Sequence, residues 1–135
     1  MNSRSIQLVL FDVDGVLTDG GLYVGPDGEI FKKFNAKDGV AVALLKAHGI
    51  QVGVISGKAS KALDFRIKQL DFDHSITGCS NKLSALEVLL ERIELGFDQV
   101  AFVGDDIIDI PVMKKVGLSI APADAHELAI NAAHY

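Results

Sequence analysis

Short apolar runs alternate along this chain with longer segments of helical period, and this alternation constrains the fold more than any other feature. The apolar runs have the length of buried strands and lie at 6–11, 52–55, 100–103 and 118–120. The helical segments lie at 39–48, 60–70, 84–95 and 107–116. Strands that are apolar throughout and joined by helices are typical of a parallel sheet covered on both faces. The sequence therefore predicts an α/β fold, and 135 residues suit one domain with a substantial core.

Residues 19–34 interrupt the alternation. Strand-forming residues stand on both sides of Gly25-Pro26-Asp27-Gly28, a sequence typical of a tight turn. The pattern predicts a β-hairpin that protrudes from the sheet. A two-stranded ribbon is marginally stable alone, and this one carries apolar residues such as Val24 and Ile30. We therefore expect the chain to form an oligomer.

Composition and charge argue against several classes of partner. The net charge of −5 argues against a nucleic-acid surface, because phosphate backbones are bound by clustered Lys and Arg. Cys79 is the only cysteine, so we expect no intrachain disulfide, and we interpret it as a packing residue. The histidines are too far apart for a local zinc motif, and we expect His74 and His126 on solvated loops. Without a signal peptide or an apolar stretch near the ~20 residues of a membrane span, we expect a cytoplasmic protein with no membrane partner.

Polar residues follow three of the predicted strands at the point where each strand ends. Asp12 and Asp14 follow the first run, Ser56 follows the second and Asp105 follows the third. Lys82 stands near the start of the third helical segment. The carboxyl ends of parallel strands lie on one edge of a sheet, where ligands bind. We therefore expect these residues to converge although they are far apart in the sequence.

Each of these features taken alone also has a structural explanation. An Asp-x-Asp pair after a strand is often a solvated turn, Ser56-Gly57 alone reads as a turn, and Lys82 alone reads as a solvated helix residue. The acidic residues of 104–109 could simply cap a helix. A calcium-binding EF-hand loop is excluded because, with Asp12 as its first position, Gly15 stands at the fourth position rather than the sixth. The combination, in this order and at strand ends, favours a catalytic site.

Such a cluster has the groups needed for phosphoryl transfer. Carboxylates crowded at one edge need a cation, and Mg²⁺ prefers hard oxygen ligands and substrate phosphate oxygens. Asp12 can attack phosphorus to give an aspartyl-phosphate, while Asp14 donates a proton to the leaving group and later takes one from water. Ser56 and Lys82 can bind the phosphoryl oxygens, where negative charge must be held.

These residues resemble the motifs of the haloacid dehalogenase superfamily of phosphatases. Asp12-Val-Asp14-Gly-Val resembles its first motif, Ser56 its second, Lys82 its third and Gly104-Asp105-Asp106-x-x-Asp109 its fourth. Within the superfamily, the chain resembles the capless phosphatases that act on 3-deoxy-D-manno-octulosonate 8-phosphate in lipopolysaccharide synthesis. The resemblance implies a three-layer, Rossmann-like parallel sheet with helices on both faces. It also implies a homotetramer whose hairpins meet centrally.

The resemblance assigns a role to each motif residue. Asp12 would be the nucleophile, and Asp14 the general acid and base. Ser56 and Lys82 would complete the catalytic set. The substrate-binding residues of that family correspond to Asp14, Asn35, Ala36, Lys37, Asp38, Gly39, Ala43, Lys58, Arg66 and Lys82.

The resemblance also implies Mg²⁺ as the cofactor. The ion would be held by Asp12, by Asp105 and by the main-chain carbonyl of Asp14. Asp106 and Asp109 would support these ligands without binding the ion themselves.

Three features depart from the pattern of that family. Its members commonly carry Arg at the positions of Ala43 and Lys58, and Lys lacks the planar fork with which Arg binds a carboxylate. The carboxylate end of the substrate is therefore expected to be bound differently. Family members also continue past the position of Tyr135 with a glycine-rich loop and a final helix. Residues 1–135 are expected to form a single phosphatase domain without that C-terminal tail.

Other functions stay open at this stage. The substrate could instead be a nine-carbon acid phosphate or a broader set of sugar phosphates. A phospho-acceptor signalling domain of receiver type shares the acidic α/β pattern, but its phosphorylated Asp follows the third strand, whereas Asp12 follows the first. A catalytically silent oligomerisation domain is the last alternative, and the retention of every motif residue argues against it. The sequence thus favours a Mg²⁺-dependent phosphoric monoester hydrolase.

Overall fold

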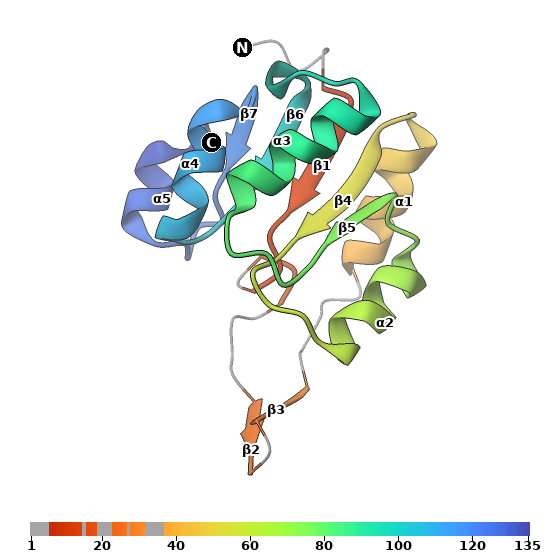
Figure 1. The fold of residues 1–135 in the computed structure, drawn as a ribbon, viewed down its shortest axis with the longest axis vertical. Helices are drawn as coiled ribbons and strands as arrows, with labels where there is room; N and C mark the ends of the chain where they lie inside the picture. Colours follow the sequence, from red (N-terminus) through yellow and green to blue (C-terminus); the bar gives the residue numbers. More distant parts are fainter. Residues whose placement is uncertain (1–5, 15, 19–22, 27, 32–36) are drawn as a thin grey trace.

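The structure is a computed structural model that describes residues 6–14, 16–18, 23–26, 28–31 and 37–135. Its centre is a five-stranded parallel sheet in the order β5-β4-β1-β6-β7 (Figure 1). The strands are β1 (Leu8–Phe11), β4 (Gln51–Ile55), β5 (His74–Ile76), β6 (Val100–Val103) and β7 (Leu118–Ile120). This arrangement confirms the predicted α/β fold.

Helices cover both faces of the sheet, with α3 crossing in front of it in Figure 1. The helices are α1 (Lys37–Ala47), α2 (Lys61–Leu70), α3 (Lys82–Ile93), α4 (Ile110–Lys115) and α5 (Glu127–Ala132), with short 3₁₀ turns η2 (Phe97–Gln99) and η3 (Ile107–Asp109). One apolar core joins α3, α4 and α5 to β1 and β6. A second, smaller core joins α2 to β1 and β4 on the other side.

The central strand β1 contributes to both cores. Successive side chains of a strand point to opposite faces of the sheet. Leu8 and Leu10 accordingly lie in the larger core with Leu86 of α3, and Phe11 packs with Leu63 of α2 in the smaller one. Because side chains on both faces of β1 pack against helices, its carboxyl end is held firmly, and that end carries Asp12.

Two strands lie apart from the main sheet. β2 (Tyr23–Gly25) pairs with β3 (Gly28–Phe31) in antiparallel fashion, and Figure 1 shows this ribbon standing away from the five-stranded sheet. The predicted hairpin at 19–34 contains both strands, but its ends at 19–22 and 32–34 and the turn residue at 27 lie outside the described residues.

Two elements near the edges of the sheet differ from the sequence prediction. His74 was expected on a solvated loop, and this was wrong: it opens β5, is half-buried, and places its Nε2 atom 2.6 Å from Oε1 of Gln51 on β4. Helix α5 was not predicted. His126 caps it, accepting the Leu128 N–H at Nδ1 over 3.1 Å, and is exposed as expected. In the described part of the chain, none of the helices has the length and apolar character needed to cross a membrane.

Candidate active site

A cleft of about 320 Å³ opens at the carboxyl edge of the sheet. Residues from the ends of β1, β4 and β6 and from the start of α3 form its walls. The described residues that line it are Asp12, Asp14, Ser56, Gly57, Lys58, Lys82, Asp105, Asp106 and Ile108. The structure thus brings together the motif residues that the sequence places at separate strand ends, as the topology of a parallel sheet requires.

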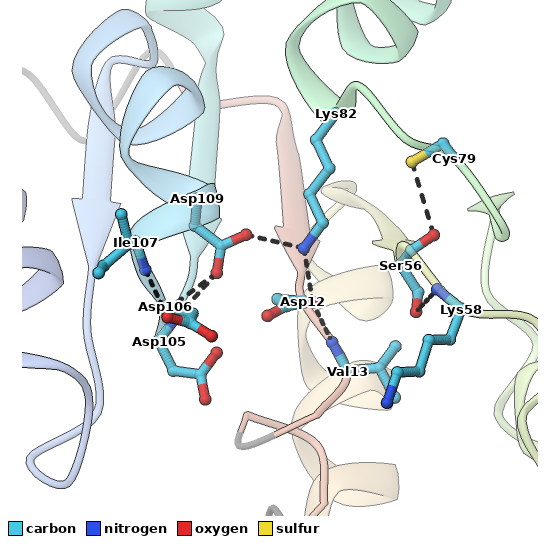
Figure 2. Close-up of polar contacts among 10 residues, drawn as sticks. All are labelled: Asp12, Val13, Ser56, Lys58, Cys79, Lys82, Asp105, Asp106, Ile107 and Asp109. Atoms are coloured by element: carbon cyan, nitrogen blue, oxygen red, sulfur yellow. Dashed lines mark hydrogen bonds and ion pairs between the residues drawn. The ribbon is translucent and has the colours of Figure 1, made fainter.

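Lys82 lies at the centre of this arrangement (Figure 2). Its Nζ atom donates to Oδ1 of Asp12 over 2.8 Å and to Oδ1 of Asp109 over 2.7 Å. Burial by itself would lower the pKa of Lys82, but the two carboxylates outweigh burial and hold that pKa above its ordinary value. Asn81 fixes the start of α3 by accepting the Ser84 N–H over 3.0 Å, so the helix delivers Lys82 at a defined position.

Asp12 is buried in an environment that disfavours its negative charge. Its Oδ1 atom accepts the N–H of Val13 over 2.8 Å as well as the Lys82 ammonium. Burial first, and the nearby charge of Asp109 second, raise the pKa of Asp12 to about 8 despite Lys82. Burial also raises the pKa of Asp105, with the charges of Asp109 and Asp106 adding to the effect. The cleft therefore holds more carboxylate charge than Lys82 can balance.

The donor set of the cleft fits a divalent cation. Asp12, Asp105 and Asp109 each offer a carboxylate oxygen, and these atoms lie within 4.8 Å of one another. Both oxygens of Asp109 are already engaged: Oδ1 accepts from Lys82, and Oδ2 accepts the N–H groups of Asp105 and Asp106 over 3.1 and 3.3 Å. Asp12 and Asp105 are thus the carboxylates suited to hold an ion, and hard oxygen donors of this kind fit Mg²⁺.

The loop that carries Asp105 is fixed from several directions. Gly104 is required there, because a Cβ atom at this position would lie 2.6 Å from Phe102 and 2.9 Å from the Cβ of Asp109. Asp106 caps η3 by accepting the Ile107 N–H over 2.7 Å. From the other side, the N–H of His126 donates to the Asp105 carbonyl over 2.8 Å. These contacts fix the backbone from which the Asp105 side chain enters the cleft.

Ser56 is held just as closely at the end of β4. Its N–H donates to the Ile76 carbonyl over 2.8 Å, and its own carbonyl accepts the N–H of Cys79 over 3.2 Å. Its Oγ atom accepts the N–H of Lys58 over 3.2 Å (Figure 2). These hydrogen bonds fix the backbone that carries the buried Ser56 hydroxyl. Cys79 packs beside Ser56 and adds a weak contact from its Sγ atom to the Ser56 carbonyl at 3.5 Å.

The predicted substrate residues fall into three groups. Lys58 lines the cleft, as do Asp14 and Lys82. Asn35, Ala36 and the side chain of Lys37 lie outside the described residues. The described residues Asp38, Gly39, Ala43 and Arg66 belong to α1 and α2 and do not line the cleft.

Asp38 and Arg66 influence each other electrostatically between α1 and α2. Burial raises the pKa of Asp38, and the nearby Arg66 guanidinium opposes that rise. Nη1 of Arg66 donates to Oε1 of Gln69 over 2.9 Å. Ala43 is exposed on α1. Two lining residues, Gly57 and Ile108, were not identified from the sequence, because neither type signals chemistry on its own.

The geometry agrees with the comparison to known proteins. Residues 23–117 match a family model described as haloacid dehalogenase-like hydrolase. This chain belongs to that family. This chain is 46% identical over 133 residues to the 3-deoxy-D-manno-octulosonate 8-phosphate phosphatase KdsC of Escherichia coli K12. The match covers 98% of this chain and 71% of the relative.

Solved structures give the same picture. The 3-deoxy-D-manno-octulosonate 8-phosphate phosphatase from Yersinia pestis superposes with a TM-score of 0.93 at 44% identity, covering 98% of this chain and 72% of that one. The corresponding Moraxella catarrhalis enzyme, solved with magnesium, phosphate and KDO, superposes with a TM-score of 0.94 at 32% identity, covering 98% and 76%. As a member of this family, the chain is a hydrolase.

Proposed function

We propose that this chain is a Mg²⁺-dependent phosphatase that converts 3-deoxy-D-manno-octulosonate 8-phosphate to 3-deoxy-D-manno-octulosonate and phosphate. The observation that carries the proposal is the buried Asp12 carboxylate at the end of β1, bonded to Lys82 and close to Asp105, in a chain 46% identical to phosphatases of that substrate. An aspartate placed this way has the two features of a phosphoryl acceptor: a fixed position and a nearby positive charge.

The reaction then proceeds in two steps. A carboxylate oxygen of Asp12 forms a bond to phosphorus, and the bond between phosphorus and the ester oxygen breaks as Asp14 gives that oxygen a proton. In the second step Asp14 takes a proton from water, which attacks phosphorus and releases phosphate and the free Asp12 carboxylate. The Ser56 hydroxyl and the Lys82 ammonium bind the phosphoryl oxygens throughout.

The residues that would hold Mg²⁺ are Asp12, Asp105 and the main-chain carbonyl of Asp14. When bound, the ion supplies positive charge that lets a phosphate approach two carboxylates. Asp109 keeps Lys82 and the Asp105 loop in place, since its two oxygens are engaged with them. Asp106 caps the turn that leads to Asp109.

The outer part of the cleft bears on the choice of substrate. Lys58 offers a point charge to a substrate carboxylate, but it has no planar fork. Ala43 offers no donor. We therefore propose weaker discrimination among sugar-acid phosphates than an arginine at these positions would give, and a nine-carbon acid phosphate is the second candidate substrate on this ground.

A panel assay tests the proposal. Hydrolysis of the octulosonate phosphate, a nine-carbon acid phosphate, neutral sugar phosphates and acetyl phosphate is measured with Mg²⁺ and with a chelator. We expect the highest kcat/KM for the octulosonate phosphate, and only with Mg²⁺. Preference for a neutral sugar phosphate would contradict the assigned substrate.

We also propose that the chain assembles as a homotetramer through the ribbon of β2 and β3. The support is that a two-stranded ribbon standing apart from a sheet needs a partner surface to be stable. Light scattering at micromolar concentration tests this, and a monomer would contradict it. A cytoplasmic location stays a prediction, which cell fractionation can check.

A further inference from the structure

Among the described residues that line the cleft, Ile108 has the only large apolar side chain. The others are acids, lysines, a serine and a glycine. Ile108 is 65% exposed, so most of its surface faces water beside a strongly charged site. Covering apolar surface in such a position with another apolar surface is favourable by roughly 25 cal/mol per Å². A bound molecule that offers C–H groups would cover it.

The backbone around Ile108 is rigid. It lies on η3, between Asp106, which caps the turn, and Asp109, whose carboxylate is fully buried. Asp109 bonds to Lys82 at 2.7 Å and to two N–H groups of the same loop. Ile108 is therefore fixed relative to the reacting Asp12, and this is the condition under which one side chain can discriminate between substrates.

Different residues lie on the two sides of Asp12 in the cleft. In Figure 2, Lys82 approaches Asp12 from one side, while the ammonium of Lys58 and the carboxylate of Asp105 lie toward the opposite side. A phosphoryl group bound at Asp12 and Lys82 must send its ester chain toward this second side. There the chain passes between the loop after β4, which carries Lys58, and the turn η3, which carries Ile108.

We propose that Ile108 is a specificity-determining residue that packs against the C–H surface of the sugar beyond the phosphate. This rests on the proposed function and adds separate roles for two side chains at the outer end of the cleft. Lys58 supplies charge to the carboxylate of the substrate, and Ile108 supplies the apolar contact that holds its carbon chain. A small phosphate compound such as acetyl phosphate reaches neither residue.

The chain offers a matched control. Ile107 is the preceding residue of the same turn and is 46% exposed, but it is not among the residues that line the cleft. Ile108→Ser and Ile107→Ser therefore remove the same group from neighbouring exposed positions. Ile108→Val keeps a branched apolar side chain and serves as the conservative variant.

The experiment measures kcat and KM for the octulosonate phosphate and for acetyl phosphate in wild type and the three variants. For Ile108→Ser we expect KM for the octulosonate phosphate to rise about five- to thirtyfold, with kcat within about twofold. Acetyl phosphate kinetics should stay within about twofold in all variants. Ile107→Ser should match wild type on both substrates, and Ile108→Val should restore most of the lost affinity.

Three results would overturn the assignment. Equal losses on both substrates would show that Ile108 acts on the catalytic loop. Equal effects of Ile107→Ser and Ile108→Ser would show a general effect on the turn. An unchanged KM with altered sedimentation of Ile108→Ser would place the side chain against another copy of the chain. If wild type instead prefers a different sugar phosphate, the assigned substrate fails, and the same comparison made with that compound still decides the role of Ile108.

Discussion

The inner and outer ends of the cleft differ in how firmly the protein holds their side chains. At the inner end, Asp12, Lys82 and Asp109 are buried and joined by hydrogen bonds of 2.7 and 2.8 Å. At the outer end, Lys58 and Ile108 are exposed, and Lys58 is placed through its backbone N–H. The reaction needs charges fixed before the substrate arrives, whereas recognition of the sugar depends on a few exposed contacts. Changes at the inner end should therefore affect every phosphate ester, and changes at the outer end only long ones.

Removing the nucleophile should have the largest effect. Asp12→Asn keeps the shape of the side chain but cannot form the phosphoryl bond, so kcat should fall at least about 10⁴-fold on both the octulosonate phosphate and acetyl phosphate. Circular dichroism controls for folding. Substantial hydrolysis by a clean preparation of the variant would contradict the covalent mechanism.

Removal of Mg²⁺ should also abolish hydrolysis of both substrates. Without the cation, Asp12 is held protonated by its raised pKa and cannot attack phosphorus, and no positive charge balances the other carboxylates of the cleft. Activity should return when Mg²⁺ is added in excess over the chelator. In Asp105→Asn the Mg²⁺ concentration needed for half-maximal activity should rise. Full activity in excess chelator would refute the metal assignment.

The crowded carboxylates also predict how stability depends on pH without metal. Burial, and then Asp109, raise the pKa of Asp12 from 3.8 to about 8 in the folded state. The folded protein therefore binds a proton that the unfolded chain releases, and this stabilisation is present below about pH 4 and lost as pH rises through about 8. The free energy of unfolding is measured by urea unfolding in chelator for wild type and for Asp12→Asn. The wild-type value minus the variant value should fall as pH rises over this range. A difference that rises with pH would contradict the charge balance described here.

The two acids of one loop give a comparison within the inner end. Asp109→Ala leaves two partly buried N–H groups without this acceptor and removes a buried partner of Lys82, so the free energy of unfolding should fall by about 2–4 kcal/mol. Asp106→Ala removes an exposed cap and should cost about 0.5–1 kcal/mol. Both values come from urea unfolding, and equal losses would show that burial does not distinguish the two acids.

At the outer end, a small effect limited to the long substrate is expected. Lys58→Arg supplies a planar fork, so KM for the octulosonate phosphate should fall about three- to tenfold, with acetyl phosphate unchanged. Ala43→Arg, on exposed α1 outside the described cleft, should have the smaller effect. A fall in KM for both substrates would mean that Lys58 acts on the phosphoryl end.

Continuous apolar runs explain why so much of the inner end could be predicted. Each run marked a buried strand, and parallel strands bring Asp12, Ser56 and Asp105 to one edge. Strand β5 could not be found in this way, because His74-Ser75-Ile76 has one apolar residue and becomes a strand only through pairing with β4. Ile108 could not be found either, because an isoleucine inside the helical segment predicted at 107–116 does not signal a site, and its exposure depends on the 3₁₀ turn.

The most direct test of the proposed chemistry is to trap the phosphorylated enzyme. Asp14→Asn removes both the acid of the first step and the base of the second. The acetate that leaves acetyl phosphate needs no proton, so with this substrate the variant should slow only the second step. The aspartyl-phosphate should therefore accumulate when acetyl phosphate is added with Mg²⁺ and the reaction is quenched in acid. Peptide mass spectrometry should then find one phosphoryl group on Asp12 in this variant and none in Asp12→Asn. Phosphorylation of another residue, or continued turnover with no phosphorylated peptide, would contradict the role of Asp12.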